Sequence, residues 1–316
     1  MSEQEKVVSP EHEFLGAGKS AAYGLQHVLT MYGGIIAPPL IVGTAAGLSG
    51  MEIGLLIAAA LFVGGLATIL QTVGVKYVGA RLPLVQGVSF AGVATMVAIV
   101  TTGGGLQAVY GAVIVSGLIG FFLAPYFSKI IRFFPPVVTG CVITIIGLSL
   151  LPVAVRWMMG GNKNAETWGS AENIGLALMT LAIVILLNLS RNAAIRRLSI
   201  LLSIVLGTIF AALLGFGDFS KVADGAWLQF PSFFAFGMPA FELTAILSML
   251  IVTLVIMTET TADIIAVGEI VGTKMDAQRI SDGLRADMLS SAAAPILAPL
   301  CKVLLRRMWA WSRSLA

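Results

Sequence analysis

Apolar runs of about twenty residues, separated by short polar stretches, follow one another along most of the chain. A helix needs about 20 apolar residues to cross the ~30 Å hydrocarbon core of a bilayer, so each run predicts a membrane span. The expected spans cover residues 20–43, 52–74, 92–102, 106–127, 134–158, 173–190, 197–216 and 241–268, with a weaker ninth candidate at 286–305. The pattern predicts an all-α polytopic membrane protein.

The third span departs from this pattern. Residues Leu82–Ala91 are rich in Pro, Gly, Val and Ser, and the helical run that follows is too short to cross a bilayer alone. Extended backbone leaves polar groups without partners, which a membrane tolerates only beside a cavity. Short, interrupted spans indicate the binding site of a transporter. A proline-kinked packing helix is the alternative.

Two carboxylates lie in the middle of the eighth apolar run, at Glu259 and Asp263. Four residues apart on a helix, they share one face. A charge at bilayer depth costs roughly 2.5–3.5 kcal/mol, so such groups are expected to face a protein interior or a water-filled cavity. Thr258, Thr260 and Thr261 add hydroxyls that hydrogen-bond a ligand or a carboxylate. This stretch predicts an ion or substrate site inside a transporter.

Composition agrees with a membrane protein. The chain is 58% hydrophobic and 11% charged, whereas soluble domains carry about 25% charged residues. Cys141 and Cys301 lie in apolar contexts and indicate neither a disulfide framework nor a metal site. The net charge of +3 gives no indication of a nucleic-acid partner. No HExxH, Ser/His/Asp set or phosphate loop is present, so an enzyme is not expected.

Basic residues indicate the orientation. With a cytoplasmic N-terminus, the outer loops hold Arg156, Lys163 and Lys221. The inner loops then hold Lys76, Arg81, Lys129, Arg132, Arg191, Arg196, Arg197, Lys274, Arg279 and Arg285. Because cytoplasmic loops carry an excess of Lys and Arg, we expect the N-terminus to be cytoplasmic. The inner stretch 272–287 is expected to be a charged linker.

Four motifs together resemble the nucleobase–ascorbate transporters, the nucleobase:cation symporter family of xanthine, urate and uracil permeases. They are Gln26-His27 with Pro38-Pro39 in the first span, Gln86–Phe90 in the third, Phe134–Gly140 before the fifth, and Glu259–Asp263 in the eighth. The similarity covers about residues 15–295. It implies about fourteen spans built as two inverted repeats of seven, of which this chain holds the first and the start of the second.

The resemblance also implies a division into a core domain that carries the substrate and a gate domain against which the core moves. It implies a cytoplasmic N-terminus at 1–19, core spans at 20–127, gate spans at 128–216, an external loop at 217–240, core spans at 241–295 and an aberrant end at 296–316. A short extended strand is expected in the third span.

Site roles follow from the same resemblance. Glu259 would accept hydrogen bonds from the N–H edge of the base, and Asp263 would take part in proton coupling with it. Ser89 to Ala91 would offer backbone amides, and Phe90 would stack on the ring. His27 matches a first-span histidine that tunes substrate affinity; from its position alone, an interfacial histidine bonded to a carbonyl is an equal alternative.

The implied function is proton-coupled symport of a purine, xanthine or urate, across a bacterial cytoplasmic membrane, with the proton as coupling ion and no cofactor. Uracil permeases tend to carry His at the position of Asp263, which favours a purine. A homodimer formed through the gate domain is expected. The alternatives are a uracil permease, a passive facilitator and a non-transporting truncated remnant.

The resemblance stops after Ala292–Pro295. The family signature Q-N-x-G-x-x-x-x-T of the tenth span is expected next, but the residues from Leu297 onward do not contain it. Codons permitted for the residues from Cys301 onward, read in a shifted frame, give QSAFAQNVGLVAVTG, which contains the signature. We therefore expect a frameshift that truncates a full permease, and poor transport by this chain alone.

DNA sequencing across codons 290–305 tests the frameshift. The expected result is a shift that places the signature directly after the apolar run. A DNA sequence that shows no frameshift across these codons would contradict it.

Overall fold

The computed structural model describes residues 16–130, 136–161, 165–216 and 236–297 of the chain. These residues form two compact units. Unit 1 comprises Met1–Ala22, Ile35–Ile146 and Phe230–Ala316, and unit 2 comprises Tyr23–Gly34 and Gly147–Gln229. Most of the expected external loop at 217–240 and most of the expected aberrant end at 296–316 lie outside the described residues.

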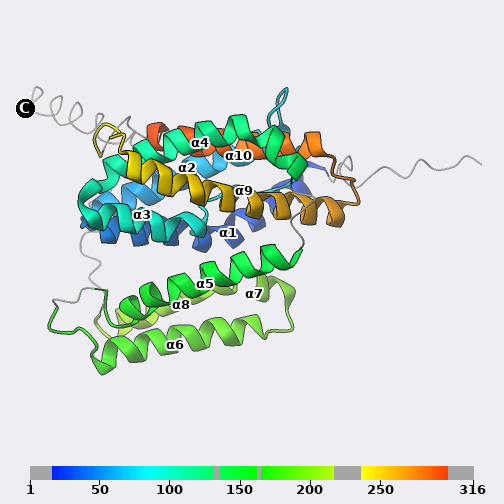
Figure 1. Ribbon diagram of the computed structural model, residues 1–316. Helices are drawn as coiled ribbons and strands as arrows, with labels where there is room; N and C mark the ends of the chain where they lie inside the picture. The colour runs from blue at the N-terminus through cyan, green and yellow to red at the C-terminus, as the bar shows by residue number, and fades with distance from the viewer. Residues whose placement is uncertain (1–15, 131–135, 162–164, 217–235, 298–316) are drawn as a thin grey trace, which may run out of the picture. The chain divides into compact units, whose positions relative to one another are not determined.

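The structure is helical, and no sheet forms among the described residues. Unit 1 contains most of α1 (Ala17–Ala45), then α2 (Gly50–Val73), the 3₁₀ turn η2 (Phe90–Gly92), α3 (Val93–Ile99), the π turn η3 (Val100–Gly104), α4 (Gly105–Ile130), α9 (Leu243–Val271) and α10 (Ala277–Leu297). Unit 2 contains most of α5 (Pro136–Met158), α6 (Ala171–Asn188), α7 (Ala193–Arg197) and α8 (Ser199–Leu213). Figure 1 labels these helices.

Five helical stretches are long and apolar enough to cross a membrane among the described residues. They are Ala17–Ala45, Gly50–Val73, Phe90–Lys129, Ala171–Asn188 and Leu243–Val271. This confirms the prediction of an all-α polytopic membrane protein. The expected third and fourth spans form one helical stretch, interrupted where Gly103 adopts φ 102°. Such a positive φ is easy for glycine and costly for other residues.

Local sequence explains where the second helix begins and ends. The Ser49 backbone N–H donates to the Glu52 carboxylate (3.0 Å), and the Glu52 N–H donates to Ser49 Oγ (3.4 Å). This reciprocal capping box satisfies amide donors that the first turn of a helix otherwise leaves free. The helix ends at Gly74, which adopts φ 67°.

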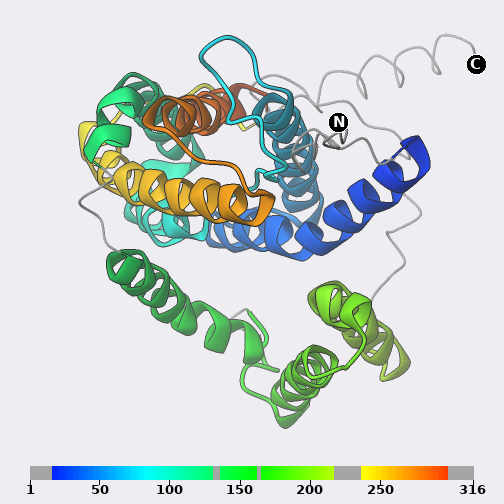
Figure 2. The same ribbon diagram turned by 90° about the vertical axis from the view of Figure 1, so that its right-hand side faces the viewer.

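The segment between α2 and η2 has no helix and no strand pairing in the described chain, apart from an isolated bridge between Val75 and Val78. It leaves the end of α2 as a cyan loop in Figure 2. Ser89, its last residue, is extended at φ −71° and ψ 134°. The interruption predicted for the third span is therefore present, whereas the short strand stays a prediction.

The stretch expected to be a charged linker is largely helical, because α10 begins at Ala277 and runs to Leu297. The expectation of a linker over 272–287 was wrong. Its charges lie on a helix that buries Ile280, Leu284 and Met288 against Ile264 of α9. A helical spacing of apolar residues within a charged stretch indicates an amphipathic helix rather than a loop.

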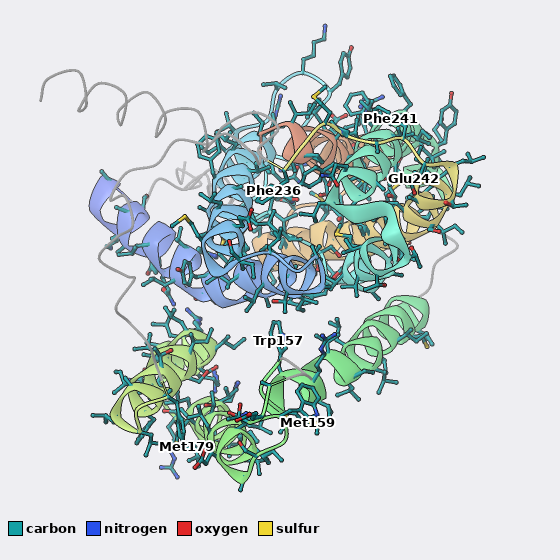
Figure 3. All side chains as sticks on the ribbon, turned by 90° about the vertical axis from the view of Figure 1, so that its left-hand side faces the viewer. Trp157, Met159, Met179, Phe236, Phe241 and Glu242 are labelled. Carbon is teal, nitrogen blue, oxygen red and sulfur yellow. The ribbon has the colours of Figure 1, made fainter. Side chains whose placement is uncertain are left out.

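The segment that leads into α9 is hydrogen-bonded to the first turn of α4. The Gln107 side chain donates to the Phe236 carbonyl (2.6 Å), and the Ala240 N–H donates to the Gln107 carbonyl (2.9 Å). Phe236, Phe241 and Glu242 lie along this connection in Figure 3. The start of the carboxylate-bearing helix is therefore anchored to the fourth span.

Helices α4, α9 and α10 pack side by side in unit 1 (Figure 1). Small residues of α4 permit this approach: a methyl group added at Gly117 would lie 2.9 Å from the Ala292 nitrogen and 3.0 Å from the Met288 carbonyl oxygen. These are backbone atoms, so no side-chain rotation relieves the contact. Close helix approach at small residues is the usual packing mode inside membranes.

Replacing Gly117 by Ala is therefore expected to separate α4 from α10 and to destabilise the protein by about 1–3 kcal/mol. Gly65→Ala on α2 is the matched control, since a methyl group there meets nothing within 4 Å. Thermal unfolding in detergent, followed by loss of the monodisperse species, measures both. Equal stability of the two variants would contradict this account of the packing.

Candidate functional site

The carboxylate predicted to bind substrate lies against the irregular third-span segment. Ser89 Oγ donates a hydrogen bond to Glu259 Oε2 at 2.8 Å. Glu259 is half-buried on α9, and η2 packs on the same helix. A hydrogen bond to an ionised group is worth about 1.5–3 kcal/mol, which offsets part of the cost of placing a carboxylate in an apolar span. The structure thus brings together two predicted site residues that are distant in sequence.

Ser89 also begins the 3₁₀ turn that carries the other predicted site residues. Its Oγ accepts a hydrogen bond from the Ala91 N–H at 3.2 Å. The Ala91 amide, expected to face a base, therefore has an intramolecular acceptor in this structure. Phe90 lies between the two residues, half-buried, in the first position of η2. Serine is well suited to this place because its hydroxyl donates and accepts at once.

Asp263 lies one helical turn beyond Glu259 and is exposed. Asp263 is therefore not buried among the described residues, and the expectation that the two acids face a protein interior or a water-filled cavity stays a prediction for it. Helices α4 and α10 cover the face of α9 that carries Met257, Thr261 and Ile264. Asp263 is the residue before Ile264, so its side chain projects about 100° around the helix from that covered face. Its predicted role in proton coupling stays a prediction.

A third carboxylate, which the sequence analysis did not single out, is buried beside this site. Thr260 Oγ1 donates to Asp287 Oδ2 at 2.6 Å, joining α9 to α10. Only 9% of Asp287 is exposed. The signal in the sequence was an acid one residue inside the weak ninth candidate span. It was overlooked because the neighbouring charges indicated a loop.

Among the described residues, no ion pair joins Glu259, Asp263 or Asp287 to Lys, Arg or His. In the described chain, the Ser89 hydroxyl donates to Glu259, and the Thr260 hydroxyl donates to Asp287.

A cavity of about 210 Å³ lies within unit 1, next to this cluster. Gln86 and Ser89 line it from the third-span segment, Thr253 from α9 and Asp287 from α10. Most other lining residues are apolar. Tyr110 of α4 also lines it and keeps a buried hydroxyl with no partner among the described residues. The arrangement, apolar walls with few polar groups, is typical of small-molecule sites.

His27 is the remaining predicted site residue. It is exposed on the part of α1 that belongs to unit 2. Its role in substrate affinity stays a prediction. No group of three or more His, Cys, Asp or Glu side chains with the spacing of a metal site occurs in the described part of the chain.

Comparison with known proteins defines the class. Residues 18–302 match a family model described as a permease family. The chain therefore belongs to the xanthine/uracil permease family, a family of membrane transporters and not of enzymes. This confirms the resemblance drawn from the four motifs.

Particular relatives are bacterial. The chain is 43% identical over 267 residues to Uric acid permease PucK of Bacillus subtilis, covering 84% of this chain and 62% of that protein. It is 39% identical over 275 residues to Xanthine permease of the same organism, covering 87% and 62%. It is 36% identical over 288 residues to Uric acid transporter UacT of Escherichia coli, covering 90% and 60%. The chain thus spans about 60% of the length of these relatives.

Removing the hydroxyl that reaches Asp287 is expected to destabilise the protein. Thr260→Val keeps the shape of the side chain but leaves the buried Asp287 carboxylate without its donor. This is expected to lower the free energy of unfolding by about 1–3 kcal/mol. Thr258→Val is the control, because Thr258 Oγ1 bonds only the Leu254 carbonyl of its own helix. Thermal unfolding in detergent compares them. A Thr260 variant as stable as the Thr258 variant would show that the contact contributes nothing.

Proposed function

We propose that this chain carries the substrate and proton site of a purine symporter that moves xanthine or urate with protons into a bacterial cell. The observation that supports it most is the 2.8 Å hydrogen bond between Ser89 of the irregular third span and Glu259 of an apolar span. A carboxylate inside a membrane is a functional feature by default. An interrupted span beside it is the usual form of a transporter site.

The chemistry of the site suits a nucleobase. A purine is flat, nearly neutral and rich in N–H donors and carbonyl acceptors. Glu259 supplies an acceptor for the N–H edge, and Ser89 supplies a hydroxyl that both donates and accepts. Phe90 supplies an aromatic face on which the ring stacks. Substrate binding exchanges the bond between Ser89 and Glu259 for bonds to the base.

Proton coupling follows from the uncompensated acids. Glu259, Asp263 and Asp287 lie on adjacent turns of two packed helices without a basic partner in the described chain. A proton on Glu259 removes the charge that otherwise resists movement through the bilayer. Each proton moving inward gains about 2.3 kcal/mol per 100 mV of membrane potential. Cotransport with the base therefore concentrates the substrate.

A purine is favoured over uracil on two grounds. Position 263 is Asp in this chain, whereas the resemblance associates His at this position with uracil permeases. The relatives described above carry the names of uric acid and xanthine permeases. We further propose that the N-terminus is cytoplasmic, that residues 128–216 form the gate domain and that two copies associate through it.

Neutral substitutions at the two acids test the mechanism in the frame-restored protein. Glu259→Gln is expected to lower uptake of labelled xanthine by about 10²-fold or more, because an amide replaces the acceptor and the proton carrier together. Asp263→Asn is expected to preserve xanthine binding and to weaken the dependence of xanthine uptake on pH. Uptake rates across a pH series, with binding to the same membranes, separate the two effects.

Glu172→Gln is the control, since Glu172 lies in the first turn of α6 in unit 2. An uncoupler should abolish accumulation by the unsubstituted protein. Accumulation that survives both the uncoupler and Glu259→Gln would favour a passive facilitator. Competition by uracil stronger than that by urate would favour a uracil permease.

The chain spans about 60% of the relatives' length, and we propose that these 316 residues alone sustain little uptake. Uptake by the 316-residue chain, compared with the frame-restored protein at equal membrane abundance, measures this. Proton-dependent xanthine uptake at similar rates in both would contradict the proposal.

A further inference from the structure

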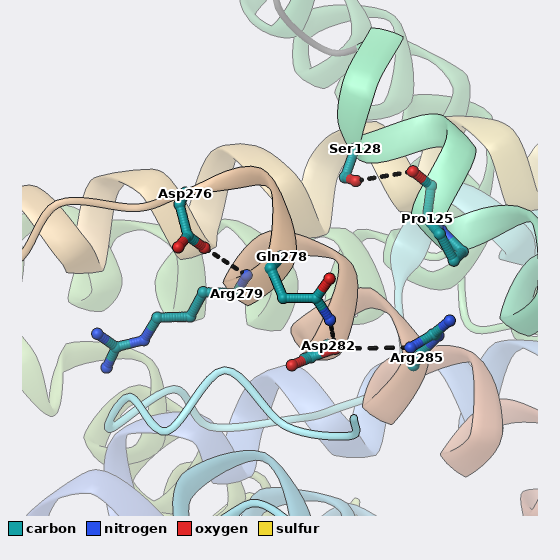
Figure 4. A network of polar contacts seen from close by, with 7 residues as sticks. All are labelled: Pro125, Ser128, Asp276, Gln278, Arg279, Asp282 and Arg285. Carbon is teal, nitrogen blue, oxygen red and sulfur yellow. Dashed lines mark hydrogen bonds and ion pairs between the residues drawn. The ribbon is translucent and has the colours of Figure 1, made fainter. Parts of the chain in front are cut away.

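Arg279 lies in the first turn of α10, where it was expected only to mark a cytoplasmic loop. Its backbone N–H donates to Asp276 Oδ1 at 2.7 Å, and the Ile280 N–H donates to the Asp276 carbonyl at 3.1 Å. Asp276 therefore caps the helix and fixes the Arg279 backbone. Figure 4 shows this contact, with the Arg279 side chain extending away from the helix.

The guanidinium of Arg279 reaches the start of the third-span segment. Its Nε donates to the Ala80 carbonyl at 2.7 Å, and its Nη2 donates to the Arg81 carbonyl at 3.0 Å. These contacts join residues nearly two hundred positions apart in sequence. A planar fork of donors fits two successive carbonyls, whereas the single ammonium of lysine does not.

The carbonyls that Arg279 holds belong to backbone with little support of its own. Arg81 adopts φ 56°, which non-glycine residues rarely do, and no helix or strand includes residues 79–89. The Gly79 N–H donates to the Asp282 carbonyl (2.7 Å), and the Arg81 N–H donates to the Gln71 carbonyl (3.0 Å). A backbone in this state keeps its path only where surrounding groups determine it.

Two further bonds fix the same segment along its length. The Gln86 N–H donates to Thr68 Oγ1 of α2 at 2.9 Å. Ser89 Oγ donates to Glu259 at its far end. The segment is therefore tied to α10 at its start, to α2 in its middle and to α9 at its end. Between Arg81 and Ser89 the path of the backbone is set by these few contacts, because no helix or strand includes residues 79–89.

We propose that Arg279 is a positioning residue for the site: by holding the Ala80 and Arg81 carbonyls, it sets the place of the third-span segment and hence of Ser89 against Glu259. The effect of this placement on purine transport rests on the proposed function. The placement of the segment by Arg279 is independent of that function, so the placement and its effect on transport are tested separately.

Thiol labelling in membranes tests the placement on the 316-residue chain without any purine. Val88→Cys, one residue before Ser89 and half-buried, is the reporter, with Cys141 and Cys301 replaced by Ala. Arg279→Gln is expected to raise the rate at which a membrane-permeant maleimide labels the cysteine at position 88 by about tenfold, because the segment loses two hydrogen bonds from a charged donor. Arg279→Lys should give an intermediate rate, since it keeps the charge but not the fork.

Two controls separate positioning from general destabilisation. Arg285→Gln removes another arginine of α10, one that pairs with Asp282 at 3.6 Å, and should leave Val88→Cys labelling unchanged. Ala112→Cys, fully buried on α4, should label no faster in the Arg279 variants. Equal labelling of Val88→Cys with and without Arg279, or a matching rise at Ala112→Cys, would overturn the proposal.

A transport measurement then tests the consequence. In the frame-restored protein, Arg279→Lys is expected to raise the KM for xanthine more than it lowers the maximal rate, because the proton-carrying acids are untouched. Faster labelling with unchanged KM would refute the link to the site. If the unsubstituted frame-restored protein took up no xanthine, the proposed function would be refuted instead.

Discussion

A bilayer leaves no unpaired polar group without cost, and this single constraint explains why the two unusual features of unit 1 lie together. An apolar span with a carboxylate needs hydrogen-bond donors, and an interrupted span needs partners for groups that no helix satisfies. In this protein the two features meet in one hydrogen bond: Ser89, at the end of the irregular segment, donates to Glu259 on α9. The same logic places Thr260 against Asp287, between α9 and α10. Both contacts are made by neighbouring residues of α9, Glu259 and Thr260.

The result is a site with hydroxyl donors and, within the described chain, no ion pair to its carboxylates. Glu259 and Asp287 are held by hydrogen bonds from the neutral hydroxyl groups of Ser89 and Thr260. The arginines of α10 are used elsewhere: Arg279 binds the carbonyls of Ala80 and Arg81, and Arg285 pairs with Asp282. Basic side chains thus shape the segment without neutralising the acids.

Much of the helical plan could be predicted from the sequence, because apolar runs of bilayer length admit few other structures. The interruption before Phe90 was also predictable, since Pro83 and Gly87 disfavour a regular helix. Contacts between distant residues were not. Asp287 was missed because nearby charges outweighed the helical spacing of Leu284 and Met288, and nothing local shows that an arginine near a membrane surface binds backbone carbonyls rather than water. The exposure of Asp263 depends on which face of α9 its neighbours cover, and that is decided by packing.

A double-mutant cycle on Ser89 and Glu259 tests the central contact most directly. The free energy of unfolding in detergent would be measured for the unsubstituted chain, Ser89→Ala, Glu259→Gln and the double variant. A direct bond between the two side chains predicts a coupling energy of about 1–3 kcal/mol, with the double variant less destabilised than the sum of the single ones. Strictly additive effects would contradict the account, because the irregular segment and the carboxylate helix would then be stabilised independently.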